Sequence, residues 1–172
     1  MNNQNEKFSL QGKTKPKPEE LIPQILSPEK QVVALDFIAW LRANKLSPKW
    51  NATNKFRADS KGKLMCYVTL FPLSNAIWWQ VLPPAESLDE WEIWINIHEQ
   101  DFYADCPDNI KQFVWNHVNT CKGCRKCHHN TMERTIGGKK FTNICHYGGG
   151  MVVKSPDVQT LEVVKELLLI NK

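Results

Sequence analysis

Long hydrophobic runs are missing from this sequence, and the longest, such as residues 167–170, are only a few residues. A transmembrane helix needs about 20 mostly apolar residues, so none is expected. The first six residues contain neither the basic nor the apolar stretch that begins a secretory signal peptide. We therefore expect a cytoplasmic protein, in which the six cysteines stay reduced and form no disulfide framework.

Basic side chains are missing from residues 85–110, which carry eight acids, although the net charge of the chain is +4. Residues 42–65 carry seven basic side chains and one acid, and residues 121–140 carry six and one. These segments could offset one another across the folded surface. Alternatively, the two basic segments could form one anion-binding face, which would favour nucleic-acid binding.

The hydrophobic pattern predicts an α+β fold in which flanking helices accompany a mostly antiparallel, four-stranded sheet. Residues 1–28 are polar and proline-rich, which is typical of a flexible N-terminal arm, with at most a short turn at 21–26. Residues 29–172 are expected to form a single domain. Apolar side chains recur at helical spacing in three segments, which are about 29–45, 105–118 and 157–170. Strand-like segments are expected over about 50–57, 64–71, 75–82 and 91–97.

Four of the six cysteines lie within residues 121–145, where they form a C-x₂-C-x₂-C motif followed by one distant cysteine: Cys121, Cys124, Cys127 and Cys145. Zn²⁺ prefers four such donors in a tetrahedron, with Zn–S distances of about 2.3 Å. Residues 121–150 show no clean periodicity and contain six glycines, so we expect a C-terminal loop that a metal organises. The other two cysteines, Cys66 and Cys106, are expected to be small buried side chains.

The identity of the metal stays open at this point. A Cys₄ zinc site is the first expectation, and a Cys₃His site is the alternative. The histidines near the motif are alternate ligands: His117, His128, His129 and His146. An iron–sulfur cluster is also possible, although the ferredoxin pattern would continue with x₃-C-P, which this sequence does not do. Four cysteines in one loop favour a closed, structural site, so we lean against an enzyme while leaving a redox or hydrolytic role open.

Seven tryptophans make the chain rich in this residue, and five lie between Trp78 and Trp115. In the predicted strand 91–97, Trp94 shares a face with Glu92 and His98, while the other face is apolar. An indole on a polar face suits a flat or cationic ligand. The carboxylates around it favour a cationic one. The candidate ligand-binding residues are Trp94, Trp78, Glu92 and His98.

The C-terminal two thirds resemble a group of small bacterial proteins of uncharacterised activity that carry a C-terminal CxxCxxC…C cluster. The resemblance rests on four segments, which are residues 101–103, residues 114–115 leading into the cysteines, residues 138–141 before Cys145, and Ser155-Pro156-Asp157. The resemblance implies a metal site and no particular activity. We therefore expect a zinc-stabilised binding module for a small molecule or a protein partner, without a membrane role, and nucleic-acid binding as the alternative.

Overall fold

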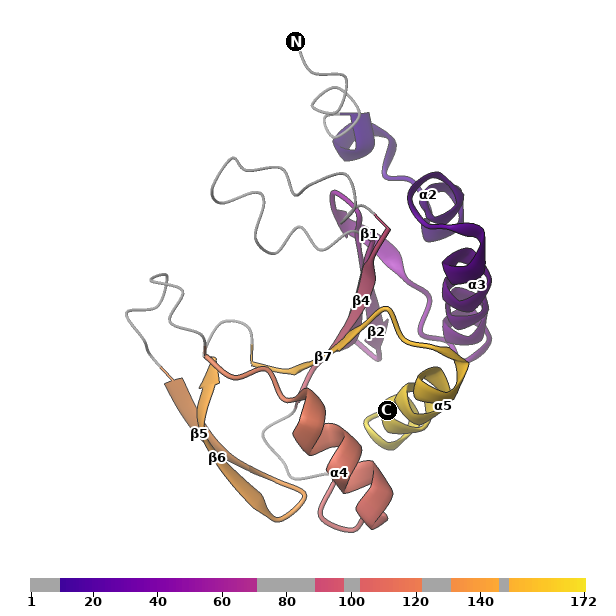
Figure 1. The fold of residues 1–172 in the computed structure, drawn as a ribbon. Helices are drawn as coiled ribbons and strands as arrows, with labels where there is room; N and C mark the ends of the chain where they lie inside the picture. Colours follow the sequence, from indigo (N-terminus) through magenta and orange to yellow (C-terminus); the bar gives the residue numbers. More distant parts are fainter. Residues whose placement is uncertain (1–9, 71–88, 98–102, 122–130, 146–148) are drawn as a thin grey trace. The chain divides into compact units, whose positions relative to one another are not determined.

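The computed structural model describes residues 10–70, 89–97, 103–121, 131–145 and 149–172 (Figure 1). Residues 10–14 form a short helical segment before the first labelled helix. No helix in the described residues is long and apolar enough to cross a membrane. The labelled elements are α2 (Pro18–Ile25), α3 (Pro28–Ala43), β1 (Lys49–Ala52), β2 (Lys55–Ser60), β3 (Lys63–Leu70), β4 (Trp91–Ile95), α4 (Asp108–His117), β5 (Thr131–Ile136), β6 (Lys139–Cys145), β7 (Met151–Lys154) and α5 (Val158–Ile170).

The main sheet has five strands in the order β1-β2-β3-β4-β7, and β5 and β6 form a second sheet of two strands. This confirms the predicted α+β class and the mostly antiparallel sheet, but the main sheet has five strands and not the predicted four. The predicted strand 50–57 is divided by a turn into β1 and β2, which pair with each other. Strand β2 also forms a hairpin with β3, in which Phe56 lies opposite Val68 and Ser60 opposite Lys63. The predicted strand over 75–82 lies outside the described residues. The β5–β6 hairpin occupies much of the segment that was predicted to be loop.

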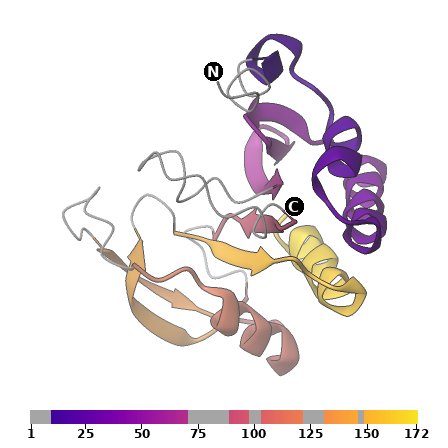
Figure 2. The same ribbon diagram turned by 45° about the horizontal axis from the view of Figure 1, so that its top comes forward.

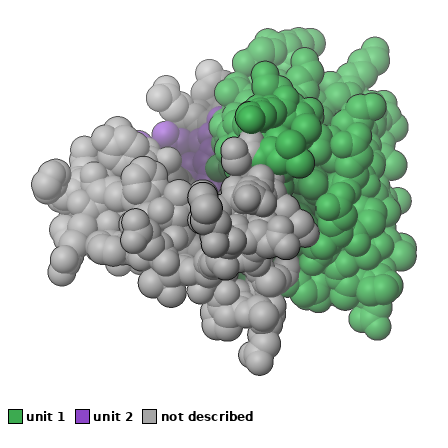
Figure 3. Space-filling model, turned by 90° about the horizontal axis from the view of Figure 1, so that it is seen from above, with its two compact units in different colours: residues 1–93, 154–157 green, residues 94–153, 158–172 purple. Residues whose placement is uncertain are grey.

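The chain groups into two compact units, which Figure 3 colours separately. Unit 1 comprises residues 1–93 and 154–157, and unit 2 comprises residues 94–153 and 158–172. Strands β4 and β7 contribute residues to both units, so the predicted single domain over 29–172 stays a prediction.

In unit 1, α2 and α3 lie on one face of the strands β1 to β3 (Figures 1 and 2). The alternation of β2 sends Phe56 and Ala58 to this face, where both are fully buried. Phe37 of α3 is also fully buried, and its ring centroid lies 6.3 Å from that of Trp91. Burial of each large apolar side chain contributes about 1.5–3 kcal/mol, so this layer is the main source of stability in unit 1.

The structure differs from the predicted flexible arm over residues 18–25, which are helical. Leu21 and Ile22 of α2 are buried, and Arg42 of α3 holds Glu19 through two hydrogen bonds of 2.6 and 2.9 Å. This ion pair lowers the pKa of Glu19, mainly through the hydrogen bonds from Arg42. The prolines misled the sequence analysis because Pro18 occupies the first turn of α2, where a missing N–H costs nothing.

In unit 2, α4 lies beside the β5–β6 hairpin, and its residues Ile110 and Val114 are buried as the helical spacing predicts. The indole of Trp115 donates a hydrogen bond of 2.7 Å to the carbonyl oxygen of Ile136 and so ties α4 to the end of β5. The hairpin turns at Gly137 and Gly138, whose φ values of 57° and 81° are left-handed. Glycine populates this region at low cost, and such turns are preferred between paired strands.

Candidate metal centre

Two of the four cysteines of the motif, Cys121 and Cys145, lie in described residues, and β6 brings them together. Cys145 is the last residue of β6 and lies opposite Thr131, the first residue of β5. On the other edge of β6, Thr120 forms an antiparallel bridge with Ile144, and the amide of Cys121 donates a hydrogen bond of 2.7 Å to the carbonyl oxygen of Asn143. Ile144 therefore pairs with neighbours on both sides, which makes β6 the middle of three extended segments.

The register places both thiols on one face of β6. Cys121 lies opposite Asn143, and directly opposed residues in an antiparallel pair point to the same face. Asn143 and Cys145 also share a face, because side chains alternate along a strand. Cys121 and Cys145 are thus diagonal neighbours, and Cα atoms in such a pair are about 7–8 Å apart, with Cβ atoms somewhat closer. Side chains at this separation can place both sulfurs about 2.3 Å from one zinc ion.

The face that carries the two thiols is the polar face of the hairpin. Thr131, Glu133 and Lys140 on this face are exposed, and Lys140 forms an ion pair of 2.7 Å with Glu133. The opposite face carries Ile136 and Ile144, which are 1% exposed. Both cysteines are half-buried, so their sulfurs lie at the surface of the hairpin and not in its core.

The chain returns to the cysteines at Gly149. A Cβ atom at this position would lie 2.5 Å from the carbonyl oxygen of Cys145 and 2.8 Å from the side chain of Ile144. The next residue, Gly150, accepts a hydrogen bond of 2.8 Å from the amide of Asn119. Three stretches of chain, 118–121, 144–145 and 149–151, therefore converge around Cys121 and Cys145.

The remaining predicted ligands lie mostly outside the described residues, namely Cys124, Cys127, His128, His129 and His146. Within the described ranges, no group of three or more histidine, cysteine or carboxylate side chains gathers at a point. His117 is half-buried near the end of α4. Its Nδ1 lies 2.8 Å from the carbonyl oxygen of Phe113, and its ring stacks on that of Phe113 at 4.2 Å.

The predicted ligand-binding face of β4 is partly described. The burial pattern of β4 alternates, so Glu92 and Trp94 share a half-buried face while Trp91, Ile93 and Ile95 are buried on the other. The indole of Trp94 lies against Gly150, because a Cβ atom there would be 2.5 Å from the ring. Trp78 and His98 lie outside the described residues.

The environment of Glu92 includes cations as well as acids. Burial raises the pKa of Glu92, and the nearby charges of Lys154 and Lys55 partly oppose this shift. Lys55 lies over the ring of Tyr67, with Nζ 4.1 Å from its centroid, and burial lowers the pKa of this amine. The acid-rich environment expected from residues 85–110 is thus balanced here by lysines from β2 and β7, which the sequence order does not reveal.

Compared with models of protein families, with curated proteins and with solved structures, the chain matches none of them. The resemblance to small bacterial proteins with a cysteine cluster therefore stays a prediction.

Sequence reasoning missed the β5–β6 hairpin and the roles of Gly149 and Gly150. The signal for the hairpin was Gly137-Gly138, a favoured two-residue turn, followed by Lys139 and Phe141. This signal was weak because the outer face of the hairpin is polar, so its two strands lack a run of apolar side chains. At Gly149 and Gly150 the backbone passes too close to its neighbours to leave room for a Cβ atom, which the sequence alone does not reveal.

Proposed function

We propose that this chain binds one zinc ion through Cys121, Cys124, Cys127 and Cys145, and that the ion organises the segment around these residues. The observation that carries the proposal is the register of β6, which puts Cys121 and Cys145 on one face as diagonal neighbours. This arrangement supports a metal site because it brings two of the four thiols, 24 positions apart in sequence, within reach of one ion.

The same register supports the participation of the other two cysteines. Cys124 follows Cys121 by three residues, and Cys127 precedes Thr131 by four. A chain spans at most about 3.3–3.6 Å per residue, so Cys124 is tethered within about 11 Å of Cys121 and Cys127 within about 14 Å of Thr131. Both anchors lie beside Cys145, which makes convergence of four thiols on one ion sterically possible.

We favour zinc over an iron–sulfur cluster because the motif does not continue with the x₃-C-P of the ferredoxin pattern. Four thiolates complete a tetrahedron and leave no position for water, which is the arrangement of a structural site. Lys122, Arg125 and Lys126 adjoin the cysteines in sequence, and cations stabilise thiolates. The proposed role is therefore a cytoplasmic binding module that zinc stabilises, with no catalytic step assigned to the ion.

The test is elemental analysis of the purified full-length chain, followed by replacement of single cysteines. We expect about one zinc per chain, a colourless protein, and loss of the metal in the Cys121→Ser and Cys145→Ser variants. Cys66→Ala is the matched control, because Cys66 is fully buried on β3 in unit 1, and this variant should keep its zinc. Iron with a brown colour, or full zinc occupancy in both serine variants, would overturn the proposal.

We further propose that the polar face of β4 serves small-ligand recognition through Trp94 and Glu92, together with Trp78 and His98. The mixed charge around Glu92 supports a ligand that carries both a cationic and an anionic group, since Lys55 and Lys154 lie near the carboxylate. Binding of zwitterionic compounds can be followed by tryptophan fluorescence. The Glu92→Gln variant should weaken it, and an unchanged response in that variant would reject the assignment.

A further inference from the structure

The face of the unit 1 sheet that points away from α2 and α3 carries charged and aromatic side chains. Along β2, the residues that alternate with buried positions are half-buried and charged: Lys55, Arg57 and Asp59. On β3, Tyr67 lies opposite Arg57 and is also half-buried. On β4, Glu92 occupies this face, because its neighbours along the strand are buried on the other face. Charges of both signs are therefore partly removed from water on one face of unit 1.

Two of these charges, those of Lys55 and Glu92, have no ion-pair or hydrogen-bond partner among the described residues. Arg57 and Asp59, by contrast, form an ion pair of 2.7 Å with each other. Burial lowers the pKa of Lys55 and raises the pKa of Glu92, so it opposes the charged form of both groups. Charges that are partly removed from water without a partner cost stability, and a ligand of opposite charge would offset this cost.

The two unpaired charges belong to strands on either side of β3. The backbones of β2 and β4 are about 10 Å apart across the sheet, since neighbouring strands are about 4.8 Å apart. Lys55 lies opposite Thr69 on β3, and its amine lies over the ring of Tyr67, 4.1 Å from the ring centroid. The side chain of Lys55 therefore extends over β3, which is the strand that separates it from Glu92. The negative charge of Glu92 acts on Lys55, and the positive charge of Lys55 acts on Glu92.

We propose that Lys55 and Glu92 bind an amino carboxylate, whose carboxylate contacts the amine of Lys55 and whose ammonium group contacts Glu92. This inference rests on the proposed ligand-binding role of the polar face of β4, to which it adds the class of ligand and a contact from β2. One cation and one anion in the site match one charge of each sign in the ligand. The ring of Tyr67 stabilises the position of the amine through a cation–π contact.

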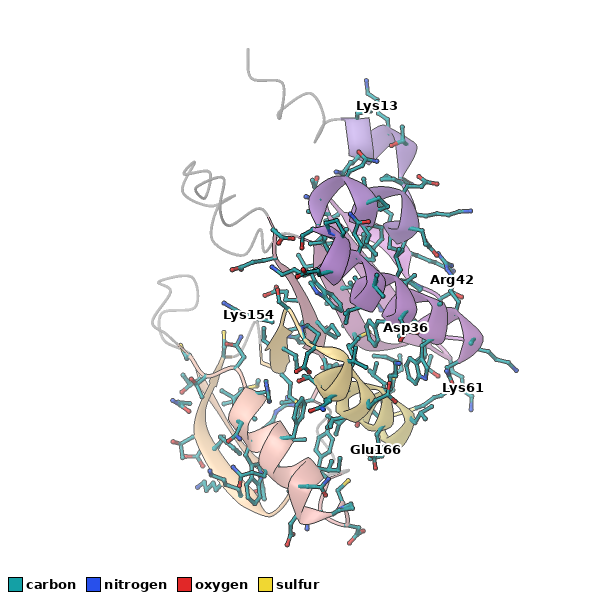
Figure 4. The ribbon with its side chains drawn as sticks, turned by 45° about the vertical axis from the view of Figure 1, so that its right-hand side comes forward. Lys13, Asp36, Arg42, Lys61, Lys154 and Glu166 are labelled. Carbon is teal, nitrogen blue, oxygen red and sulfur yellow. The ribbon has the colours of Figure 1, made fainter. Side chains whose placement is uncertain are left out.

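Lys154 is the other lysine whose charge acts on Glu92, and it differs from Lys55 in exposure. It is the last residue of β7 and is exposed. Figure 4 shows Lys154 on one side of unit 1 and Arg42 of α3 on the other. Exposed ion pairs contribute little, because water solvates both charges and salt screens them. The half-buried amine of Lys55 is therefore the stronger partner for the carboxylate of the ligand.

The test is isothermal titration calorimetry of the full-length chain at pH 7 with three linear amino carboxylates of increasing length, which are glycine, 4-aminobutyrate and 6-aminohexanoate. We expect at least one of them to bind. Butyrate and propylamine each carry only one of the two charges. They should bind roughly 10- to 100-fold more weakly than the best of the three, the effect of losing a hydrogen bond to a charged group.

Lys55→Met is the test variant, because methionine keeps an unbranched side chain and removes the charge. We expect it to weaken binding roughly 10- to 100-fold. Its thermal stability should stay equal or rise, since a charge that burial opposes is removed, and this measurement separates loss of binding from loss of fold. Lys154→Met is the matched control, and it should weaken binding by less than about fivefold.

Equal affinities in the parent chain and in Lys55→Met would overturn the inference, and so would equal losses in the two lysine variants. If Glu92→Gln still weakened the fluorescence response to a zwitterion in the first case, the proposed ligand-binding face of β4 would stand without the contact from Lys55. Absence of binding by all three amino carboxylates would also overturn the inference. A fluorescence response to an amino sulfonate such as taurine would then preserve the proposed face and reject only the class of ligand.

Discussion

The indole ring of Trp94 lies directly on the backbone of Gly150. A Cβ atom on Gly150 would be 2.5–2.6 Å from three atoms of the ring, closer than side-chain carbons approach one another. The polar face of β4 therefore carries an indole that is held in place by close backbone contact. Its second role, as a ligand platform, stays a proposal.

The Gly150→Ala substitution is expected to destabilise unit 2 by about 1–3 kcal/mol, the usual cost of overpacking. The added methyl group must displace the ring of Trp94 or the chain beside it. Chemical denaturation followed by circular dichroism measures the loss. Gly12→Ala is the control, since a Cβ atom on Gly12 meets nothing within 4 Å. A Trp94→Leu background should remove most of the cost of Gly150→Ala, and equal costs in both backgrounds would contradict the assigned contact.

The sequence predicted α3, α4, α5, β3 and β4 because each of these elements has its own local signal. Ser27-Pro28 marks the beginning of α3, and the spacing of Ile110 and Val114 gives the buried face of α4. The residues around the cysteines were harder to assign. The pairing of Cys121 with Asn143 depends on the register of β6, and register follows from long-range packing that no local pattern records.

The N-terminal helices illustrate the same difficulty. Residues 10–14 and α2 are too short to be stable alone, and their sequences are polar. They are fixed by contacts with distant residues, such as those between Gln11 and Asn54, 43 positions apart. A single sequence gives no sign of such a contact.

Gln11→Ala is expected to destabilise unit 1 by about 1–3 kcal/mol, because it leaves buried polar groups of Asn54 without partners. Gln11 donates to the side-chain oxygen of Asn54 at 2.7 Å and accepts from its amide at 2.9 Å. Thermal unfolding measures the change. Gln24→Ala is the control, because Gln24 makes only an exposed hydrogen bond, to the carbonyl oxygen of Glu20, and it should shift stability by less than about 0.5 kcal/mol. Similar losses in both variants would refute the buried amide pair.

Cys66 is expected to resist thiol reagents in the folded protein at pH 8. Burial raises the pKa of its thiol to about 12, and the reactive thiolate is therefore almost absent. In protein treated with a chelator, a mass-spectrometric time course should show Cys121 and Cys145 labelled long before Cys66. Denaturant should then make Cys66 react at the rate of an ordinary cysteine. Fast labelling of Cys66 before unfolding would contradict its burial.

Glu92→Gln is expected to stabilise unit 1 at neutral pH. Burial raises the pKa of Glu92, with Lys154 and Lys55 opposing the shift and Glu90 adding to it. A carboxyl group whose pKa is higher in the folded state adds stability below its unfolded pKa of about 4.5, and this contribution is lost as the pH rises through the folded pKa. The advantage of the variant should therefore be largest near pH 7 and should shrink as the pH falls toward 4.5. Denaturation curves at several pH values measure it, with the exposed Glu166→Gln on α5 as the control. A Glu92→Gln variant that is less stable than the parent chain at pH 7 would mean that the attraction of the two lysines exceeds the cost of burial.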